Sequence, residues 1–290
     1  MAAGKLFLPL FTMSSPTIAS EALDAAVVFT GRGGSGTRLL SQLAEEIGVF
    51  IGNRVNRSGD SIEWVDLVYR LAVGTAASAE LPTGSLYRRE LRARAAAVLD
   101  GSPAGASAPW GLKLPEAMLV LPLLVDAFAR AKVVHMTRHP VASSLRRTHM
   151  TSRLNNAVGA ATLPNAYRYS KRDVGAIASD EPYLHNACSW NYQVSRVLRY
   201  GRESLGPARY LELRYEDVCM DPSPGITRVR ALLGRAAGGR PGSVSVDPSR
   251  MGGWDARDPR VEMVWKICGE TAALLGYSRT PPAPSAEERE

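Results

Sequence analysis

A glycine-rich turn between an apolar strand pattern and a helix pattern constrains the fold of this chain more than any other feature. Residues 30–39 read TGRGGSGTRL and follow the apolar run at 25–29. Glycine lets the backbone approach a ligand closely, and the unpaired N–H groups and dipole at the start of a helix attract an anion. The sequence therefore predicts a strand, a loop that holds a phosphorylated ligand, and a helix.

The loop differs from the P-loop of nucleoside-triphosphate enzymes at two positions. Its outer glycines have the P-loop spacing, but Thr37 and Arg38 stand where that motif has lysine and then serine or threonine. A P-loop kinase also has an aspartate at the end of a second strand to hold magnesium. Here the strand expected at 132–137 is followed by Arg138. This arginine indicates a second anion site, and hence a ligand with phosphates at two separate places.

Apolar periodicity predicts that strands and helices alternate along the chain. After the loop, Leu39, Leu43 and Ile47 recur at helical spacing before Gly48. Further helices are expected at 61–71, 85–99, 115–128, 140–147, 183–198, 226–233 and 261–275, and further strands at 110–114, 132–137 and 210–213. Such alternation predicts an α/β fold with a mostly parallel central sheet flanked by helices. Ligands bind such sheets beyond the carboxyl ends of the strands, where both the loop and Arg138 are expected.

We expect one domain at 25–280, preceded by an N-terminal arm at 1–24 and followed by a disordered tail at 281–290. The arm has a short apolar stretch that is broken by proline, which is not typical of a signal peptide. Residues 151–181 lack clear periodicity and are predicted to form a long loop at an acceptor site. The glycine-rich start of 235–257 predicts a flexible segment.

Composition favours a soluble, cytoplasmic protein. The chain has 290 residues, 45% of them apolar, which is enough for a full core. Cys188, Cys219 and Cys268 are odd in number and widely spaced, so we expect no disulfide framework, no zinc site and a reducing compartment. No run approaches the roughly 20 apolar residues of a membrane span.

The formal charge of +7 raises the alternative of a nucleic-acid-binding protein. No reader motif or aromatic-basic platform accompanies that charge, so we expect no nucleic-acid partner. The sequence leaves the oligomeric state open.

Four segments together resemble the sulfotransferases that use 3′-phosphoadenosine 5′-phosphosulfate (PAPS). They are the loop at 31–38, GLKLP at 111–115, the strand and turn at 132–144 with RHP at 138–140, and YLELRYED at 210–217 with Asp-Pro at 221–222. The resemblance covers most of residues 25–235 and implies the P-loop nucleotide-hydrolase-like architecture of that family. It also implies a metal-independent enzyme that moves a sulfuryl group from PAPS to a hydroxyl of a small molecule or a sugar. A role in natural-product tailoring, with a secondary metabolite as acceptor, is the preferred version. A P-loop small-molecule kinase using ATP and magnesium is the alternative.

The resemblance also assigns donor-binding residues. The loop would bind the 5′-phosphosulfate, and Arg138 with hydroxyls of the following helix would bind the 3′-phosphate. The expected donor-binding residues are Arg32, Gly33, Gly34, Ser35, Gly36, Thr37, Arg38, Arg138, Ser143, Ser144 and Arg146.

At two of these positions the chain departs from the family pattern. Gly34 stands where many members have lysine or arginine, and Arg32, Arg38 or Lys113 would supply that charge instead. Arg146 stands where the family often has a serine, so a serine of the same helix would take that place.

Sulfuryl transfer needs positive charge on the bridging oxygen and a base for the acceptor hydroxyl. We expect Lys113 to supply the charge. Three residues are candidates for the base, and His149 is preferred because its ordinary pKa of about 6.5 suits proton removal. Glu116 lies close to Lys113 in sequence, and Glu63 lies on a helix expected to flank the mouth of the site.

Overall fold

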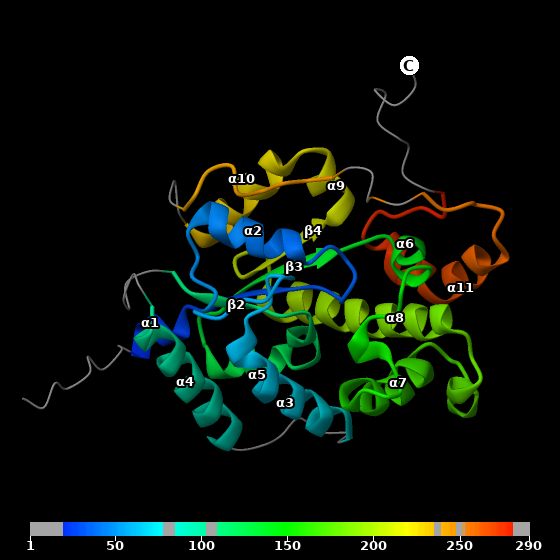
Figure 1. Ribbon diagram of the computed structural model, residues 1–290, viewed down its shortest axis with the longest axis horizontal. Helices are drawn as coiled ribbons and strands as arrows, with labels where there is room; N and C mark the ends of the chain where they lie inside the picture. The colour runs from blue at the N-terminus through cyan, green and yellow to red at the C-terminus, as the bar shows by residue number, and fades with distance from the viewer. Residues whose placement is uncertain are drawn as a thin grey trace, which may run out of the picture.

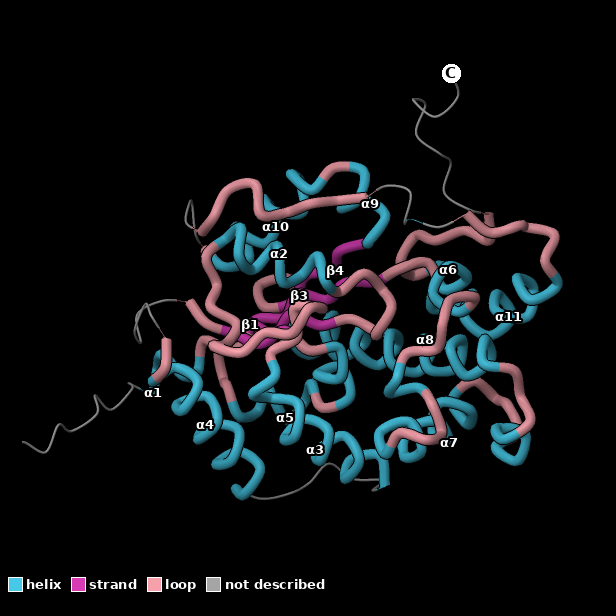
Figure 2. Tube along the Cα trace, viewed as in Figure 1, coloured by secondary structure: helices cyan, strands magenta, loops and turns pink. Residues whose placement is uncertain are grey.

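A computed structural model of the chain describes residues 20–77, 85–102, 109–234, 239–247, 251 and 253–280. Within these residues a parallel sheet of four strands, in the order β2-β1-β3-β4, forms the centre (Figures 1 and 2). The strands are β1 (Val27–Thr30), β2 (Gly111–Lys113), β3 (Lys132–Thr137) and β4 (Tyr210–Arg214). In the register, Val27 lies opposite both Gly111 and Lys132. The predicted parallel α/β architecture is confirmed.

Helices cover both faces of the sheet (Figure 1). One face carries α2 (Arg38–Ile47), α9 (Tyr215–Met220) and α10 (Pro222–Leu233). The other carries α3 (Val65–Ala77), α4 (Ser85–Asp100), α5 (Leu121–Ala127) and α8 (Pro182–Tyr200), with α6 (Pro140–Ser144), α7 (Ala157–Tyr169) and α11 (Pro259–Ala273) next to α8. The remaining helical segments are α1 (Ser20–Asp24), the 3₁₀ turns η1 (Ile62–Trp64), η3 (Pro115–Leu119), η4 (Met150–Ser152) and η5 (Val174–Ala178), and the π-helical turn η6 (Gly201–Leu205).

The two faces explain why the first three residues of β1 are all apolar rather than alternating with polar ones. All four of its residues are buried. Successive side chains of a strand point to opposite faces, so Val27 and Phe29 pack with Leu43 of α2, whereas Val28 packs into the core on the other side. Strands covered on both faces have nearly continuous apolar runs.

The helix after the glycine turn follows the sequence prediction. Leu39, Leu40, Leu43 and Ile47 are all buried along α2. The helix ends at Gly48, whose φ of 72° is the left-handed conformation that favours glycine at a helix end.

Residues 151–181 are mainly helical, so the prediction of a long loop is wrong. Helix α7 begins after Asn156, whose side chain accepts a hydrogen bond from the Val158 N–H. Its buried residues do recur at helical spacing, but Pro164 inside the helix interrupts that pattern in the sequence. The turn η5 follows α7 and leads into α8.

Two further helices differ in extent from their predictions. The helix expected at 115–128 is divided into η3 and α5 at Val120, whose φ of −121° is not helical. The helix expected at 140–147 ends at Ser144. Residues 1–19 of the predicted arm, the tail at 281–290 and parts of 235–257 lie outside the described residues.

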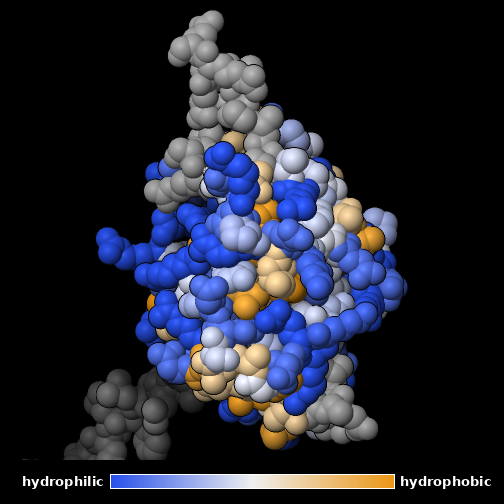
Figure 3. All heavy atoms as spheres, turned by 90° about the vertical axis from the view of Figure 1, so that its right-hand side faces the viewer, coloured by the Kyte–Doolittle hydropathy of each residue, from blue (hydrophilic) through white to orange (hydrophobic). Residues whose placement is uncertain are grey.

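None of the described helices is long and apolar enough to cross a membrane. Cys188, Cys219 and Cys268 are buried free thiols. The face shown in Figure 3 is largely hydrophilic, with hydrophobic residues in small separate groups. Such scattered apolar surface is ordinary for a protein in water.

Substitutions of two glycines test how closely β2 packs against β1. A Cβ at Gly111 would lie 2.0 Å from the Val27 carbonyl oxygen, whereas a Cβ at Gly74 in α3 would meet nothing within 4 Å. We expect Gly111→Ala to lower the free energy of unfolding by about 2 kcal/mol, because the strands must separate. Gly74→Ala should raise it by about 1 kcal/mol, because alanine is the better helix former. Urea unfolding measures both, and equal effects of the two substitutions would contradict the close approach of β2 to β1.

Candidate active site

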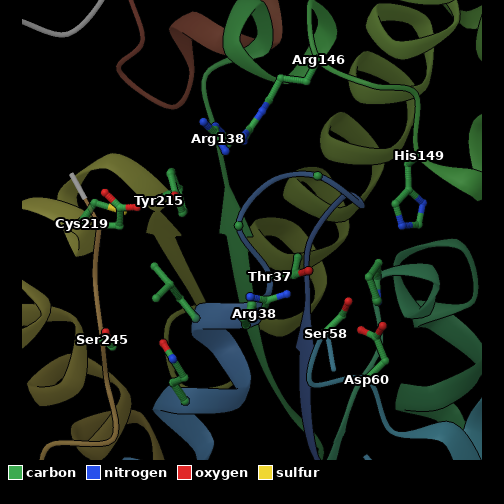
Figure 4. A pocket seen from close by; sticks show the side chains of 16 residues that line it. Thr37, Arg38, Ser58, Asp60, Arg138, Arg146, His149, Tyr215, Cys219 and Ser245 are labelled. Atoms are coloured by element: carbon green, nitrogen blue, oxygen red, sulfur yellow. The ribbon is translucent and has the colours of Figure 1, made fainter. Parts of the chain in front are cut away.

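A cavity of about 570 Å³ opens beyond the carboxyl ends of the strands (Figure 4). Residues that follow each strand line it: Thr37 after β1, Pro115 after β2, Arg138 after β3 and Tyr215 after β4. Residues of the glycine loop and Arg138 line this one cavity. A cavity of this size falls within the range of small-molecule sites, about 300–1,000 Å³.

The glycine loop leads directly into the start of α2. Gly34 and Gly36 have φ values of 92° and 78°, in the region that favours glycine. A Cβ at Gly36 would lie 2.0 Å from the ring of Tyr215, so no side chain fits there. The Ser35 hydroxyl is buried without a partner among the described residues.

The two arginines of the loop have different surroundings. Arg38 lines the cavity. Arg32 is buried, and its guanidinium donates hydrogen bonds to Asn186 Oδ1 at 2.8 Å and to the Gly33 carbonyl at 3.1 Å. Its Nη1 lies 3.8 Å from the place of a Cβ at Gly34. Positive charge therefore reaches the position of Gly34 from a neighbouring residue.

Arg138 lies in the wall of the cavity with 1% of its surface exposed. Its guanidinium stacks on the ring of Tyr215, 4.4 Å from the ring centre, and donates to the Met251 carbonyl at 3.2 Å. Arg146 approaches it from the chain after α6 (Figure 4). Burial, and then the charge of Arg146, lower the pKa of Arg138. An anion between these two arginines would be favoured by both.

The two serines of α6 do not line the cavity. Ser143 and Ser144 are buried, and their hydroxyls have no partner among the described residues. They lie near Arg138 in sequence but, unlike Arg146, they do not face the cavity.

Lys113 at the end of β2 is fully buried. Its ammonium donates to Asp60 Oδ1 at 2.7 Å and to the Ser58 carbonyl at 2.8 Å. Burial lowers the pKa of Lys113, and Asp60 partly offsets this. Asp60 lines the cavity, and the Asn56 side chain donates to its second oxygen at 3.0 Å.

Asp60 is a site residue that the sequence analysis missed. The Asn-Arg-Ser-Gly-Asp run at 56–60 predicts a turn. Nothing in the run shows that this turn reaches the lysine of β2.

His149 lines the cavity next to the glycine loop. A Cβ at Gly33 would lie 2.4 Å from its ring, so the loop and the ring are in close contact. Its Nδ1 lies 2.9 Å from the Thr151 hydroxyl, which donates to Glu116 Oε1 at 2.9 Å. A hydroxyl has one proton, so toward His149 the Thr151 oxygen accepts. Nδ1 therefore carries the ring proton, and Nε2 has a free lone pair.

Burial shifts the pKa values of both His149 and Glu116. It lowers the pKa of His149 to about 4, helped by the charges of Arg32 and Lys113 and opposed by Asp60. It raises the pKa of Glu116 to about 7. His149 is thus neutral at pH 7, but its lowered pKa makes it a weaker base than the ordinary histidine that the sequence led us to expect.

Glu63 lies outside the cavity. Its carboxylate accepts a hydrogen bond from the Arg54 N–H at 2.7 Å and contacts the turn at Gly52. Of the three expected candidates for the base, only His149 lines the cavity, and Glu116 lies behind Thr151.

Solved structures of sulfotransferases share this fold. One from Alicyclobacillus acidocaldarius has a TM-score of 0.52 and 15% identity, covering 88% of this chain and 96% of that one. The sulfotransferase domain of the Synechococcus PCC 7002 olefin synthase has a TM-score of 0.49 and 16% identity, with 88% and 94% covered. A sulfotransferase from Mycobacterium tuberculosis has a TM-score of 0.49 and 17% identity, with 84% and 76% covered.

At these identities the structural likeness concerns the fold alone, which the Alicyclobacillus protein shares with this chain. No curated protein matches the sequence. The profile of the sulfotransferase family matches residues 67–237, which is more than half of the chain. The matched range includes Lys113, Arg138 and His149. The chain therefore belongs to the sulfotransferase family.

Proposed function

We propose that this protein transfers a sulfuryl group from PAPS to a hydroxyl of a small-molecule or sugar acceptor. The observation that carries the proposal is the pairing of two anion-binding segments on one cavity. The glycine loop with Arg38 forms one, and Arg138 with Arg146 forms the other. PAPS has phosphate groups at two separate places, and these two segments suit its 5′ and 3′ ends.

The arrangement of the cavity suggests how the donor would lie. Tyr215, Cys219 and Ser245 lie on one side of the loop, whereas Ser58, Asp60 and His149 lie on the other (Figure 4). The nucleoside would take the Tyr215 side. The transferred group would then face Asp60 and His149, where the acceptor enters, with Lys113 buried behind Asp60.

Bound PAPS supplies the sulfuryl group and a phosphate leaving group. The N–H groups at the start of α2 and the charge of Arg38 would stabilise the negative charge that develops on that phosphate. Lys113 would add positive charge from below the cavity, held in place by Asp60. His149 Nε2 would take the proton of the acceptor hydroxyl, with Thr151 and Glu116 keeping the ring proton on Nδ1.

A small-molecule kinase that uses ATP and magnesium is not favoured. The chain belongs to the sulfotransferase family, and an arginine follows β3 where a magnesium-binding acid would stand in a P-loop kinase. A secondary metabolite remains our preferred acceptor class.

Incubation with PAPS and a panel of phenols, nucleosides and sugars tests the proposal directly. We expect one acceptor to gain the mass of a sulfonate group without magnesium.

Calorimetry should also show that the protein binds 3′-phosphoadenosine 5′-phosphate. Arg138→Ala should raise the Kd of this nucleotide by a factor at least about ten times larger than the factor by which it raises the Kd of adenosine 5′-phosphate. A preference for ATP with magnesium would overturn the assignment.

Substitution of His149 tests the base. We expect His149→Gln to lower kcat by about 10²–10⁴-fold while the affinity for 3′-phosphoadenosine 5′-phosphate changes little. The acidic limb of the pH profile of kcat/KM should disappear, because the neutral form of His149 is the active one. Glu63→Gln is the matched control and should retain activity; a loss of activity only in that variant would move the role of base to Glu63.

Glu116 gives a prediction about stability. Its pKa rises from an ordinary value of 4.5 to about 7 on folding, so between these values the folded protein holds a proton that the unfolded chain has released. Stability is therefore lost as the pH rises through this window, by about 3 kcal/mol for this group. Glu116→Gln removes the titration. In thermal unfolding, the stability of the variant relative to the unmodified protein should increase as the pH rises from 5 to 8. If this difference in stability stays constant over that range, Glu116 is ionised in both the folded and the unfolded state.

A further inference from the structure

Arg32 is a buried cation that no described carboxylate pairs with. Its side chain is 2% exposed, and burial lowers its pKa to about 10. Among the described residues, its guanidinium donates hydrogen bonds to neutral oxygens, those of Asn186 and Gly33. Burying a charge without an opposite charge is costly, with a penalty of several kcal/mol. The burial of Arg32 in this position therefore needs an explanation.

Asn186 of α8 is the residue that holds it. This asparagine is fully buried, and its Oδ1 accepts from Arg32 Nη2 at 2.8 Å. Its Nδ2 donates to the Ser144 carbonyl at 2.9 Å and to the Arg146 carbonyl at 3.1 Å. One amide thus joins the glycine loop to the chain that follows Arg138.

Trp190 of the same helix binds the other end of that chain. It lies four residues after Asn186, on the same face of α8, and its indole N–H donates to the Arg138 carbonyl at 2.9 Å. Helix α8 therefore fixes the segment 138–146 at both ends. Of these two residues, Asn186 also bonds the glycine loop, through Arg32.

We propose that Asn186 is a positioning residue that couples the two anion-binding segments, so that the loop and the Arg138–Arg146 pair stay at one fixed separation. The proposal rests on the proposed function, because it concerns a donor with phosphates at both ends. A ligand that binds two sites at once gains affinity when the sites are held at the right spacing beforehand. The amide suits this role because it has both an acceptor for Arg32 and donors for two carbonyls.

The test compares two nucleotides and a matched pair of variants. Adenosine 5′-phosphate occupies one segment, and 3′-phosphoadenosine 5′-phosphate occupies both. The Kd of adenosine 5′-phosphate divided by the Kd of 3′-phosphoadenosine 5′-phosphate measures the affinity that the 3′-phosphate adds once the 5′ end is bound. Calorimetry without metal should show that Asn186→Ala lowers this ratio about tenfold, the size of coupling found between contacting residues.

Asn191 provides the control. It is also a buried asparagine of α8, but its side chain accepts from Thr271 and donates to Ser170, away from the loop. Asn191→Ala should leave the ratio of Kd values unchanged. A purely structural role of Asn186 would weaken both nucleotides by the same factor and also leave the ratio unchanged.

Asn186→Asp is the second variant. It keeps an acceptor and adds a charge that pairs with Arg32, so it is expected to fold even if the alanine variant does not. It lacks the donors to the Ser144 and Arg146 carbonyls, so the ratio should fall here too. Because its carboxylate neutralises Arg32, adenosine 5′-phosphate should also bind more weakly than it does to the unmodified protein.

The outcomes separate this inference from the proposed function. If the unmodified protein shows no gain in affinity from the 3′-phosphate, the proposed donor is wrong. If it shows that gain and both Asn186 variants retain it in full, the coupling role of Asn186 is overturned while the donor assignment stands. A smaller ratio in both variants, with Asn191→Ala unchanged, supports the coupling.

Discussion

The parallel pairing of β1 with β3 is the constraint on which the rest of the site depends. Parallel neighbours end at the same edge of a sheet, so the glycine loop after β1 and Arg138 after β3 face one cavity. The pairing of β2 with β1 then places Lys113 beside them. Residues far apart in sequence reach the same cavity because of strand order, and the helices on both faces keep that order fixed.

The site concentrates buried positive charge. Burial lowers the pKa of Arg32, Lys113 and Arg138. Among the described residues Lys113 has a carboxylate partner, in Asp60, whereas Arg32 is held by neutral groups. Such an arrangement stabilises the free protein poorly and suits an anionic ligand, which is the usual relation between local stability and function at a binding site.

Local patterns explain which features could be predicted from the sequence. The loop, the helix after it and the position of Arg138 follow from glycine content and apolar periodicity over short stretches. Asp60 and Asn186 could not be predicted, because their roles depend on partners 53 and 154 residues away in the chain. Helix α7 was missed because Pro164 interrupts its pattern. Glu63 was expected at the mouth, but its carboxylate binds the Arg54 backbone instead.

The contact between Gly36 and the ring of Tyr215 has a consequence for how this chain can evolve. A side chain at position 36 requires a smaller residue at position 215, but a smaller residue there removes the surface on which Arg138 stacks. The two positions are therefore epistatic, because the effect of a substitution at one position depends on the residue at the other. Diversification of the enzyme should accordingly proceed at positions of the cavity wall that lie outside this stack.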